Sequence, residues 1–510
     1  MNKSDGSVIV LVCDGHQGDG QDLNSLTALV TQLLPSASIR VIRSLCTHPR
    51  ALAKVRRQLA GDVVVLSPCR THLERRVPVA ELRNAVRDSW TPLKRLVIID
   101  PTSLVTRTAP QRDRLHAIAL TAAAFSEETF APALAPFEFA FDGIGRRELL
   151  TGRLRRPSPP VPQLADPACL ASPRCHLCVD SCPTSALTLR DGIPSIDRSA
   201  CTGCGSCVTA CPIDAILLDS LPRHEWEAYL ERVLTAAQQL DQPLGIWWIC
   251  QHSESPSDLA DDLAWLQLRL PCLTAATLAW VVQPLTAGAK GVAVTPCESC
   301  ATWWAPEGPR SLLVQKLVGT PTLEPLPGSS MWRVVTPHRV SSRIKLREPA
   351  ATADALIRLH VSNEQLIASP ASPLGVVNCD ADRCTSCGLC IEVCPTRALT
   401  ARDAPDSWAL AFAHSGCAAC GGCVAVCPES TLTLCRGIEP TELKGSRDLI
   451  VTRVRRCDAC SAALPPLVLV RRFAAAGVII PDDRICGDCR SVGRRASREN
   501  LSCVGTTDIS

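Results

Sequence analysis

The sequence predicts a multidomain protein of the α/β plus α+β class, in which two parallel-sheet α/β domains are interleaved with two small cysteine-rich modules. Three observations support this fold class. The chain has 510 residues, and at roughly 100–200 residues per domain this length corresponds to about three to five domains. Strand-like and helix-like runs alternate in two long stretches, which is the pattern of α/β domains. Many of the 30 cysteines fall into repeated runs outside these stretches.

The first α/β domain is predicted to span residues 1–150. Apolar runs suited to buried parallel strands occur at residues 8–13, 39–46, 62–69 and 95–100, and helical patterns between them include 22–34 and 49–58. Three of these strands close on a cysteine, namely Cys13, Cys46 and Cys69. Ligands of a parallel α/β sheet bind beyond the carboxyl ends of its strands. The three cysteines are therefore predicted to meet at one sheet edge, either as a partial cluster site or as a scaffold without metal.

Prolines divide the rest of the chain. A first linker is marked by Pro157, Pro159, Pro160 and Pro162, and a second boundary by Pro321, Pro325 and Pro327. The predicted order is a cysteine-rich module at residues 163–222, an α/β domain at 225–325, a linker region at 326–374, a second cysteine-rich module at 375–437 and a tail at 450–495. In the second α/β domain, strands are expected near residues 245–250, 268–272 and 291–297.

Three cysteine runs match the pattern C-x2-C-x2-C-x3-C-P without a gap. They are Cys201, Cys204, Cys207 and Cys211; Cys384, Cys387, Cys390 and Cys394; and Cys417, Cys420, Cys423 and Cys427. This run supplies the ligands of bacterial ferredoxins, in which the cysteine before proline ligates the other cluster of a pair. A cubane needs one thiolate for each iron, and three come from one tight loop. Two runs in one module therefore predict two [4Fe–4S] clusters that depend on each other.

The first run of the chain departs from this pattern. Cys175, Cys178 and Cys182 are in place, but Ser172 stands where the first cysteine belongs, and Cys169 lies three residues earlier. A longer loop would deliver Cys169 to the cluster as the first ligand. The alternative is a [3Fe–4S] cluster with Cys169 free.

The runs resemble the dicluster bacterial ferredoxins, and this resemblance implies four [4Fe–4S] clusters with crossed ligands. The ligand sets are Cys169, Cys175, Cys178 and Cys211; Cys201, Cys204, Cys207 and Cys182; Cys384, Cys387, Cys390 and Cys427; and Cys417, Cys420, Cys423 and Cys394. A zinc array is not expected, because zinc sites use two CxxC-type pairs. Disulfides are not expected either, because a thiol-rich cytosolic chain more often binds metal.

Four further cysteines lie at strand ends of the second α/β domain. Cys250, Cys272 and Cys297 follow the three expected strands, and Cys300 is three residues further along. The same sheet geometry predicts that they converge on one edge as a metal site. The alternative is that they are small buried hydrophobes, as free cysteines often are.

Residues 247–250, 258–260, 270–272, 288–292 and 297–300 of this domain resemble the delta subunit of methyl-viologen-reducing hydrogenase. That family carries a [2Fe–2S] cluster and passes electrons between a hydrogenase or formate dehydrogenase and heterodisulfide reductase. The resemblance implies a [2Fe–2S] cluster on Cys250, Cys272, Cys297 and Cys300. Family members usually have more cysteines near the first position and a wider last pair.

The N-terminal segments 10–13 and 63–72, together with Cys46, resemble the amino-terminal region of the flavin-containing subunit of heterodisulfide reductase, which holds a [4Fe–4S] cluster. One expected cysteine is absent here, because Asp14 and Gly15 follow Cys13. The flavin domain of that family is also missing. No G-x-G-x-x-G follows a strand, so neither flavin nor NAD is expected in this chain.

The basic tail carries two CxxC pairs, Cys457 with Cys460 and Cys486 with Cys489. Two such pairs are typical of a four-cysteine zinc ribbon or knuckle. The alternatives are a further iron–sulfur cluster and a tail without metal.

Bulk properties limit the function. A formal net charge of only +3 gives no indication of a basic surface for nucleic-acid binding. No run approaches 18 uninterrupted apolar residues, and residues 1–24 do not resemble a signal peptide, so a cytoplasmic protein without a membrane span is expected.

The sequence thus predicts an iron–sulfur electron-transfer subunit. It would relay electrons between a redox enzyme of the heterodisulfide reductase, hydrogenase or formate dehydrogenase type and an acceptor. Flavin- or metal-containing oxidoreductase subunits are the expected partners, in a hetero-oligomer. The alternatives are a reductase whose active site is the strand-end cysteine group of the second α/β domain, and a redox sensor.

Overall fold

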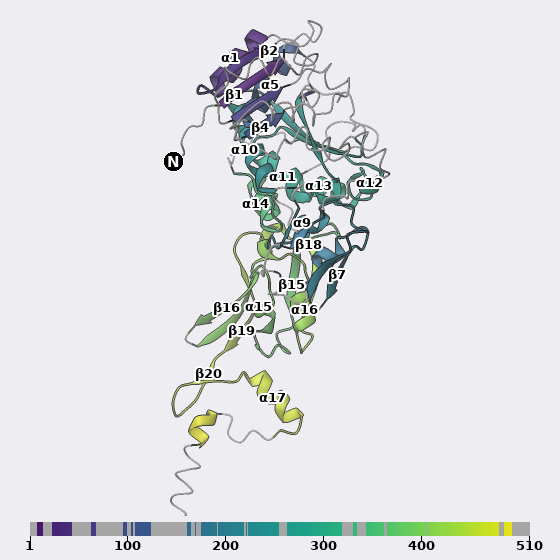
Figure 1. Ribbon diagram of the computed structural model, residues 1–510. Coiled ribbons are helices and arrows are strands. Elements are labelled where there is room, and N and C mark those ends of the chain that lie inside the picture. Colours follow the sequence, from purple (N-terminus) through teal and green to yellow (C-terminus); the bar gives the residue numbers. More distant parts are fainter. Residues whose placement is uncertain are drawn as a thin grey trace, which may run out of the picture.

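The structure is a computed structural model that describes residues 8–13, 23–42, 63–67, 95–98, 104–105, 108–123, 161–164, 169, 175–190, 192–218, 221, 223–253, 263–318, 330–333, 343–361, 365–404, 406–478 and 484–491. Figure 1 shows these parts arranged lengthwise, from an N-terminal sheet through a middle domain and two cysteine-rich modules to the tail. Among the helices of these residues, none combines the length and the apolar character needed to cross a membrane.

Four parallel strands form the N-terminal sheet, in the order β2-β1-β3-β4. They are β1 (Val8–Cys13), β2 (Ser38–Ile42), β3 (Val63–Ser67) and β4 (Arg95–Ile98). Helix α1 (Leu23–Leu33) buries Leu26 and Val30 and packs against α5 (Ala109–Ala123). The four predicted strands and the helix predicted at residues 22–34 are confirmed over the described residues. The helix predicted at 49–58 lies outside the described residues.

Five strands form the sheet of the middle domain, in the order β13-β12-β10-β11-β5. The three central strands, β10 (Leu244–Cys250), β11 (Ala264–Leu270) and β12 (Gly291–Thr295), run parallel. The two edge strands, β5 (Leu104–Val105) and β13 (Ser330–Arg333), pair antiparallel. The central strands therefore all end at the same edge of the sheet, as the sequence predicted.

One predicted strand of this sheet is displaced. The strand expected at residues 268–272 begins at Ala264 and ends at Leu270. Gln267 and Arg269 interrupt its apolar pattern, although Gln267 is buried. Cys272 follows the strand after a bend, as the sequence predicted.

Helices cover the faces of the middle sheet. They are α10 (Arg223–Gln239), α11 (Leu278–Thr286), α12 (Glu298–Trp304), α13 (Pro309–Val318) and α14 (Ala350–Arg358), with a 3-10 turn, η4 (Leu273–Ala275). Strand β13 and helix α14 belong to the segment predicted as a linker, and α14 packs on α11. The Glu348 carboxylate, just before α14, accepts bonds from the N–H of Ala279 (2.9 Å) and the hydroxyl of Thr352 (2.7 Å). The middle domain is thus completed by chain segments on both sides of residues 225–325.

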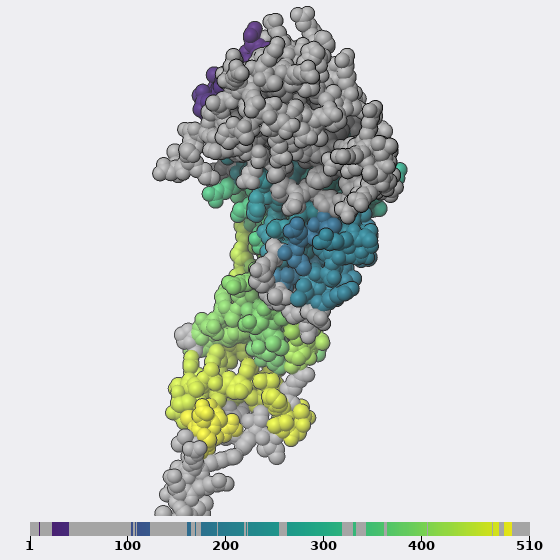
Figure 2. Space-filling model, viewed as in Figure 1, coloured from purple at the N-terminus to yellow at the C-terminus, as the bar shows by residue number. Residues whose placement is uncertain are grey.

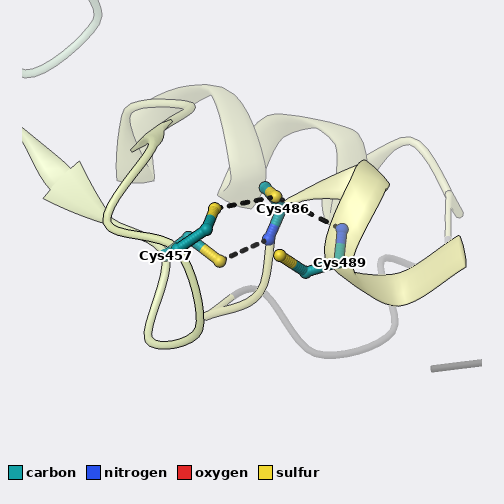
Figure 3. A group of neighbouring side chains, drawn as sticks. Cys457, Cys486 and Cys489 are labelled. Atoms are coloured by element: carbon teal, nitrogen blue, oxygen red, sulfur yellow. Dashed lines mark hydrogen bonds between the residues drawn. The ribbon is translucent and has the colours of Figure 1, made fainter. Parts of the chain in front are cut away.

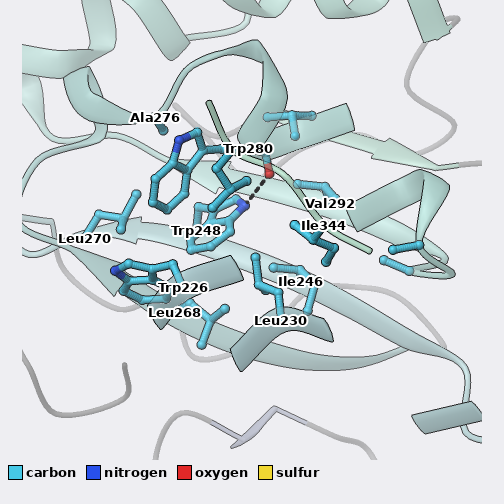
Figure 4. Packing of buried hydrophobic residues seen from close by; sticks show 14 of the residues in the cluster. Trp226, Leu230, Ile246, Trp248, Leu268, Leu270, Ala276, Trp280, Val292 and Ile344 are labelled. Carbon is cyan, nitrogen blue, oxygen red and sulfur yellow. Dashed lines mark hydrogen bonds between the residues drawn. The ribbon is translucent and has the colours of Figure 1, made fainter. Parts of the chain in front are cut away.

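Tryptophans fill the centre of the middle domain. Trp226, Trp248 and Trp280 pack edge to face, with ring centroids 5.2–6.0 Å apart, and the indole N–H of Trp248 donates to the carbonyl of Trp280 at 3.0 Å (Figure 4). Each such aromatic pair contributes about 0.5–1.5 kcal/mol beyond simple burial. This core fixes the position of β10, the strand that ends on Cys250.

The first cysteine-rich module has two similar halves. Its elements are β6 (Gln163–Leu164), α8 (Leu177–Asp180), β7 (Leu187–Arg190), β8 (Ile193–Ile196), α9 (Ser206–Ala210) and β9 (Ile216–Leu217). Strand β6 pairs antiparallel with β9, and β7 pairs antiparallel with β8.

The second module repeats this plan in a larger form. Its elements are β14 (Ile367–Ala368), β15 (Gly375–Cys379), α15 (Leu389–Glu392), β16 (Leu399–Ala404), β17 (Ser407–Phe412), η5 (His414–Gly416), α16 (Gly422–Val426), β18 (Leu432–Ile438), η6 (Pro440–Glu442) and β19 (Arg447–Arg453). Strand β15 pairs with β18, and β16 with β17, while β14 and β19 widen the two sheets. Figure 2 shows the two modules lying directly against each other.

The tail follows the second module. It consists of β20 (Arg455–Arg456), β21 (Ala463–Leu464), helix α17 (Leu467–Ala475) and a short helical turn at residues 487–491. Strands β20 and β21 form a small antiparallel hairpin. The mixed α/β fold class with several small sheets is therefore confirmed.

Candidate metal centres

The three gap-free cysteine runs share one backbone geometry. In each run the residue after the second cysteine is a glycine with a left-handed φ, which is 79° for Gly205, 77° for Gly388 and 74° for Gly421. Each glycine is the N-cap of the short helix that carries the third cysteine, and glycine adopts this conformation without a Cβ clash. In the first run of the chain, His176 occupies this position with φ −112°. The loop of that run is therefore built differently.

The four Cys-Pro segments also share a turn. The third residue after each of these cysteines has a positive φ between 49° and 58°; these residues are Ser185, Asp214, Arg397 and Ser430. The turn directs the next backbone N–H at the cysteine. Ala215 N–H donates to Cys211 Sγ at 3.3 Å, and Ala398 N–H donates to Cys394 Sγ at 3.2 Å. Hydrogen bonds to sulfur are among the contacts that set the potential of iron–sulfur centres.

Three cavities in the modules are each lined by four of the predicted cysteine ligands. Site II is lined by Cys182, Cys201, Cys204 and Cys207. Site III is lined by Cys384, Cys387, Cys390 and Cys427. Site IV is lined by Cys394, Cys417, Cys420 and Cys423. In each cavity three cysteines come from one run and the fourth from the other Cys-Pro segment of the same module.

The surroundings of these cavities fit a [4Fe–4S] cluster. Four thiols face each one, and aliphatic and aromatic side chains complete the wall, for example Leu187 in site II, Trp408 in site III and Phe412 in site IV. Burial raises the pKa of the third cysteine of each run, to about 12 for Cys207 and Cys390. Such buried thiols are held as thiolates when a metal compensates their charge.

The fourth predicted set, site I, gathers around Cys178. The thiol of Cys178 is buried, and burial together with the neighbouring thiols of Cys169 and Cys211 raises its pKa to about 11. Cys175 also lies beside Cys178. Cys169 therefore lies beside other cysteines of site I. This position favours the hypothesis that Cys169 is a cluster ligand over the alternative of a [3Fe–4S] cluster with Cys169 free.

The four strand-end cysteines of the middle domain converge as well, and we call them the middle site. The sulfur atoms of Cys250, Cys297 and Cys300 lie within 4.8 Å of one another, and those of Cys297 and Cys300 are 3.2 Å apart. The thiol of Cys272 lies beside those of Cys250 and Cys300. Cys250 and Cys300 are fully buried. The shared carboxyl edge of β10, β11 and β12 thus brings together all four residues that the sequence predicted.

Hydrogen bonds make Cys272 the most thiolate-like member of the middle site. Bonds from Cys250 and Cys300 lower its pKa, and the Thr274 hydroxyl adds a further bond at 3.1 Å. The same bonds among the thiols, followed by burial, raise the pKa of Cys300. A shared proton network of this kind releases its protons when a metal binds.

A buried guanidinium compensates the negative charge of this site. Arg310 donates to the carbonyls of Thr274 (2.9 Å) and Ala276 (2.6 Å) and stacks on Trp303, with 5.0 Å to the ring centroid. Burial lowers its pKa to about 10, so it remains a cation at neutral pH. Because Arg310 interacts with Cys272, it favours thiolates in the middle site.

The tail cysteines form another group, the tail site. Cys457 and Cys460 lie in the β20–β21 loop, and Cys486 and Cys489 lie at the helical turn that follows α17. All four sulfur atoms lie within 4.8 Å of one another. The N–H of Cys486 donates to Cys457 Sγ at 3.2 Å, and the N–H of Cys489 donates to Cys486 Sγ at 3.5 Å (Figure 3). Four sulfurs at this spacing suit a tetrahedral metal.

The N-terminal cysteines are described in part. Cys13 is the last residue of β1, at the carboxyl edge of its sheet. Cys46 and Cys69 lie outside the described residues, so their meeting with Cys13 stays a prediction.

One cysteine near a site was not predicted. The thiol of Cys379, the last residue of β15, hydrogen-bonds with Cys384 of site III and lies 3.9 Å from the hydroxyl of Thr431. That hydroxyl is also 3.4 Å from Cys427 Sγ. The position of Cys379, at a strand end five residues before a cysteine run, is the signal that the sequence offered.

Comparison with known proteins supports the presence of two dicluster modules. Residues 172–215 and residues 383–432 each match a family described as a 4Fe-4S dicluster domain. The chain is 44% identical over 48 residues to an uncharacterized ferredoxin of Methanocaldococcus jannaschii, covering 9% of this chain and 32% of that protein. It is 41% identical over 64 residues to the ferredoxin-type protein NapF of Escherichia coli, and this match covers 11% of this chain and 39% of NapF. The chain thus spans about a third of the length of these relatives.

A shorter relative is matched over most of its length. The chain is 31% identical over 55 residues to the Ferredoxin 7Fe of Hydrogenibacillus schlegelii, covering 11% of this chain and 70% of that protein. Two dicluster modules and these matches define a polyferredoxin-type iron–sulfur protein with up to four [4Fe–4S] clusters. The chain belongs to the ferredoxin family.

Proposed function

We propose that this chain is an iron–sulfur electron-transfer subunit that relays electrons between a redox enzyme and an acceptor. The observation that carries the proposal is the set of three cavities, each lined by three cysteines of one run and one of the other. Bound clusters supply one-electron redox chemistry. The chain supplies the thiolates, backbone donors to sulfur such as Ala215 N–H, and an apolar wall that limits access of water.

We assign one [4Fe–4S] cluster to each of sites I to IV. In site I the assignment uses Cys169 as the first ligand, because Cys169 lies beside Cys178 and Cys211. The crossed ligands are Cys211 for site I, Cys182 for site II, Cys427 for site III and Cys394 for site IV.

The middle site is proposed to hold a [2Fe–2S] cluster. Its four thiols and the nearby Arg310 cation suit an anionic metal–sulfur centre. The resemblance of this domain to the hydrogenase delta subunit supports a partner of the hydrogenase, formate dehydrogenase or heterodisulfide reductase type. The N-terminal resemblance to the flavin-containing subunit of heterodisulfide reductase points to the same class of partner.

The tail site is proposed to hold zinc. Two CxxC pairs on a hairpin loop and a helical turn form the common plan of a structural zinc site. Backbone N–H donation from Cys486 lowers the pKa of Cys457 to about 6, which favours a thiolate ligand at neutral pH.

A reductase with its active site at the middle site is not favoured. Cys250 and Cys300 are fully buried, and Cys272 is nearly so. A disulfide substrate needs access to an attacking thiolate, and Cys297 is the only one of the four thiols that is partly exposed. Its neighbour Cys300, which would have to complete a dithiol reaction, is fully buried.

The iron content of the anaerobically purified protein tests the proposal. Four cubanes and a [2Fe–2S] centre hold 18 iron atoms, so iron analysis should return roughly 16–22 atoms per chain. Fewer than about 12 would contradict the four-cluster assignment. Zinc should be present at about one atom per chain.

A single substitution tests the crossed ligands. Cys394→Ser should change the electron paramagnetic resonance (EPR) signal of the cluster in site IV, because Cys394 lines that cavity with Cys417, Cys420 and Cys423. Cys390→Ser is the matched control and should change the signal of site III. The crossed assignment is wrong if Cys394→Ser affects site III alone.

A further inference from the structure

The two ferredoxin modules meet through a pair of cysteines. The thiol of Cys175, in site I, lies beside the thiol of Cys420, in site IV. Each is the second cysteine of its run, and the two runs are far apart in the sequence. The residues that bring sites I and IV closest are therefore cluster ligands themselves.

Packing holds this junction in place. One hydrophobic cluster includes Leu187 of the first module and Leu374 and Ile438 of the second. Within the second module, the Arg436 guanidinium holds the loop of site IV by donating to the carbonyl of Ala419, the residue before Cys420, at 3.3 Å. Figure 2 shows the first module resting on the second. The contact between Cys175 and Cys420 thus belongs to a packed boundary.

A second junction joins the first module to the middle domain. The Thr274 hydroxyl donates to Cys272 Sγ of the middle site at 3.1 Å and also lies within hydrogen-bonding reach of Cys204 in site II. The Ser206 hydroxyl donates to the carbonyl of Thr274 at 3.4 Å. Gly205 lies so close to η4 that a Cβ on it would be 3.3 Å from the Cβ of Ala275. Site II and the middle site are therefore neighbours, with η4 and its Thr274 between them.

Inside each module the two sites are also neighbours. The thiol of Cys178 in site I lies near that of Cys207 in site II, and the thiol of Cys390 in site III lies near that of Cys423 in site IV. Helices α8 and α9 contact each other, and so do α15 and α16. Each site thus has a defined neighbour on at least one side.

We propose that the cysteine sites form one continuous path, in the order middle site, site II, site I, site IV and site III, with Thr274 and the Cys175–Cys420 pair as its two inter-domain junctions. This order rests on the proposed electron-transfer function. It differs from the order of the cysteine runs along the chain. Each step moves one electron, oxidising the centre that it leaves and reducing the centre that it enters, with an external one-electron reductant such as dithionite as the source. Transfer between protein-bound centres falls steeply with distance, so the closest ligands set the route.

EPR spectroscopy of matched variants tests the junction between sites I and IV. One variant retains sites I and IV, through alanine at Cys201, Cys204, Cys384 and Cys387. Its control retains sites I and III, through alanine at Cys201, Cys204, Cys417 and Cys423. Both should keep about eight cubane iron atoms. After dithionite reduction, the first variant should show spin–spin splitting, and the control should show loss of that splitting.

The outcomes separate the order of sites from the function. Splitting in the control but not in the first variant would overturn the proposed order. Wild-type protein that loads no [4Fe–4S] clusters would instead overturn the proposed function. If the variants fail to load, wild-type protein can be oxidised with ferricyanide and its disulfides mapped by mass spectrometry. The dominant disulfide between the modules should join Cys175 to Cys420, and a dominant disulfide from any other pair would overturn the junction.

Discussion

The hydroxyl of a single residue, Thr274, lies between sulfur atoms of two different sites. It donates to Cys272 Sγ at 3.1 Å and lies within hydrogen-bonding reach of Cys204. A donor to sulfur stabilises the reduced and more negative state of a centre. Thr274→Val should therefore lower the reduction potential of the centre in the middle site, whose Cys272 Sγ receives this bond, by on the order of 40 mV, the equivalent of about 1 kcal/mol for one electron.

A redox titration followed by EPR spectroscopy measures this effect. Thr302→Val is the control, because Thr302 is exposed on α12 and its hydroxyl donates to the carbonyl of Ser299 in the same helix at 3.4 Å. Equal potentials in Thr274→Val and Thr302→Val would show that the hydroxyl does not act on the sulfur atoms.

The unpredicted Cys379 has a second consequence at the residue scale. Its thiol hydrogen-bonds with Cys384, so it stands where it can replace that ligand in site III. Cys384→Ser should keep close to the wild-type iron content. The double variant Cys379→Ala with Cys384→Ser should lose about four iron atoms per chain. Iron analysis decides the matter, and equal iron loss in both variants would exclude replacement by Cys379.

At the scale of elements, the packing of β10 on β11 allows no side chain at Gly245. A Cβ there would lie 2.3 Å from the ring of Trp265, which is buried and cannot move away. Gly245→Ala should lower the free energy of unfolding by about 1–3 kcal/mol, as overpacking does. Denaturant unfolding followed by tryptophan fluorescence measures this change. Gly487→Ala is the control, because a Cβ there meets nothing within 4 Å, and it should change stability by less than about 0.5 kcal/mol.

The junction of α14 with α11 should respond to pH. Burial raises the pKa of Glu348 from 4.5 to about 7. Because the folded chain keeps this proton over a range in which the unfolded chain has lost it, the free energy of unfolding should fall as the pH rises from 4.5 to about 7. The slope from this one group is roughly 1.4 kcal/mol per pH unit. Glu348→Gln should lack this slope when unfolding is measured between about pH 5.5 and pH 7.5, and parallel curves for the two proteins would contradict the assignment.

The elements also show what the sequence could and could not predict. Strands such as β10 and β12 were predictable because they are continuous apolar runs, and their cysteines mark one sheet edge. The start of β11 was missed because Gln267 is polar yet buried. The edge strand β5 has two residues and no pattern of its own, so only tertiary pairing with β11 defines it. The contacts of Cys379 and Thr274 likewise depend on chain segments that meet only after folding.

At the scale of the whole molecule, shared packing fixes the distances between domains. One hydrophobic cluster contains residues of α1 and α5, of the first module, of the middle domain, of α14 and of strands β14 and β18 of the second module. A separate cluster surrounds sites III and IV. A protein that passes electrons between fixed centres needs such rigidity, because a shared core opposes relative movement of its domains.

The last prediction concerns what the whole chain does without a partner. Iron–sulfur cubanes usually carry one electron each, whereas NADH and substrate disulfides react in two-electron steps, which flavins convert into single electrons. No dinucleotide-binding glycine motif follows a strand in this sequence. The isolated protein should therefore contain no stoichiometric flavin and should oxidise NAD(P)H negligibly, while dithionite should reduce its clusters rapidly. Absorbance spectroscopy and stopped-flow kinetics measure these properties. Bound flavin adenine dinucleotide, or steady NADH-driven turnover by the chain alone, would contradict the proposed relay function and indicate a reductase that acts without a partner.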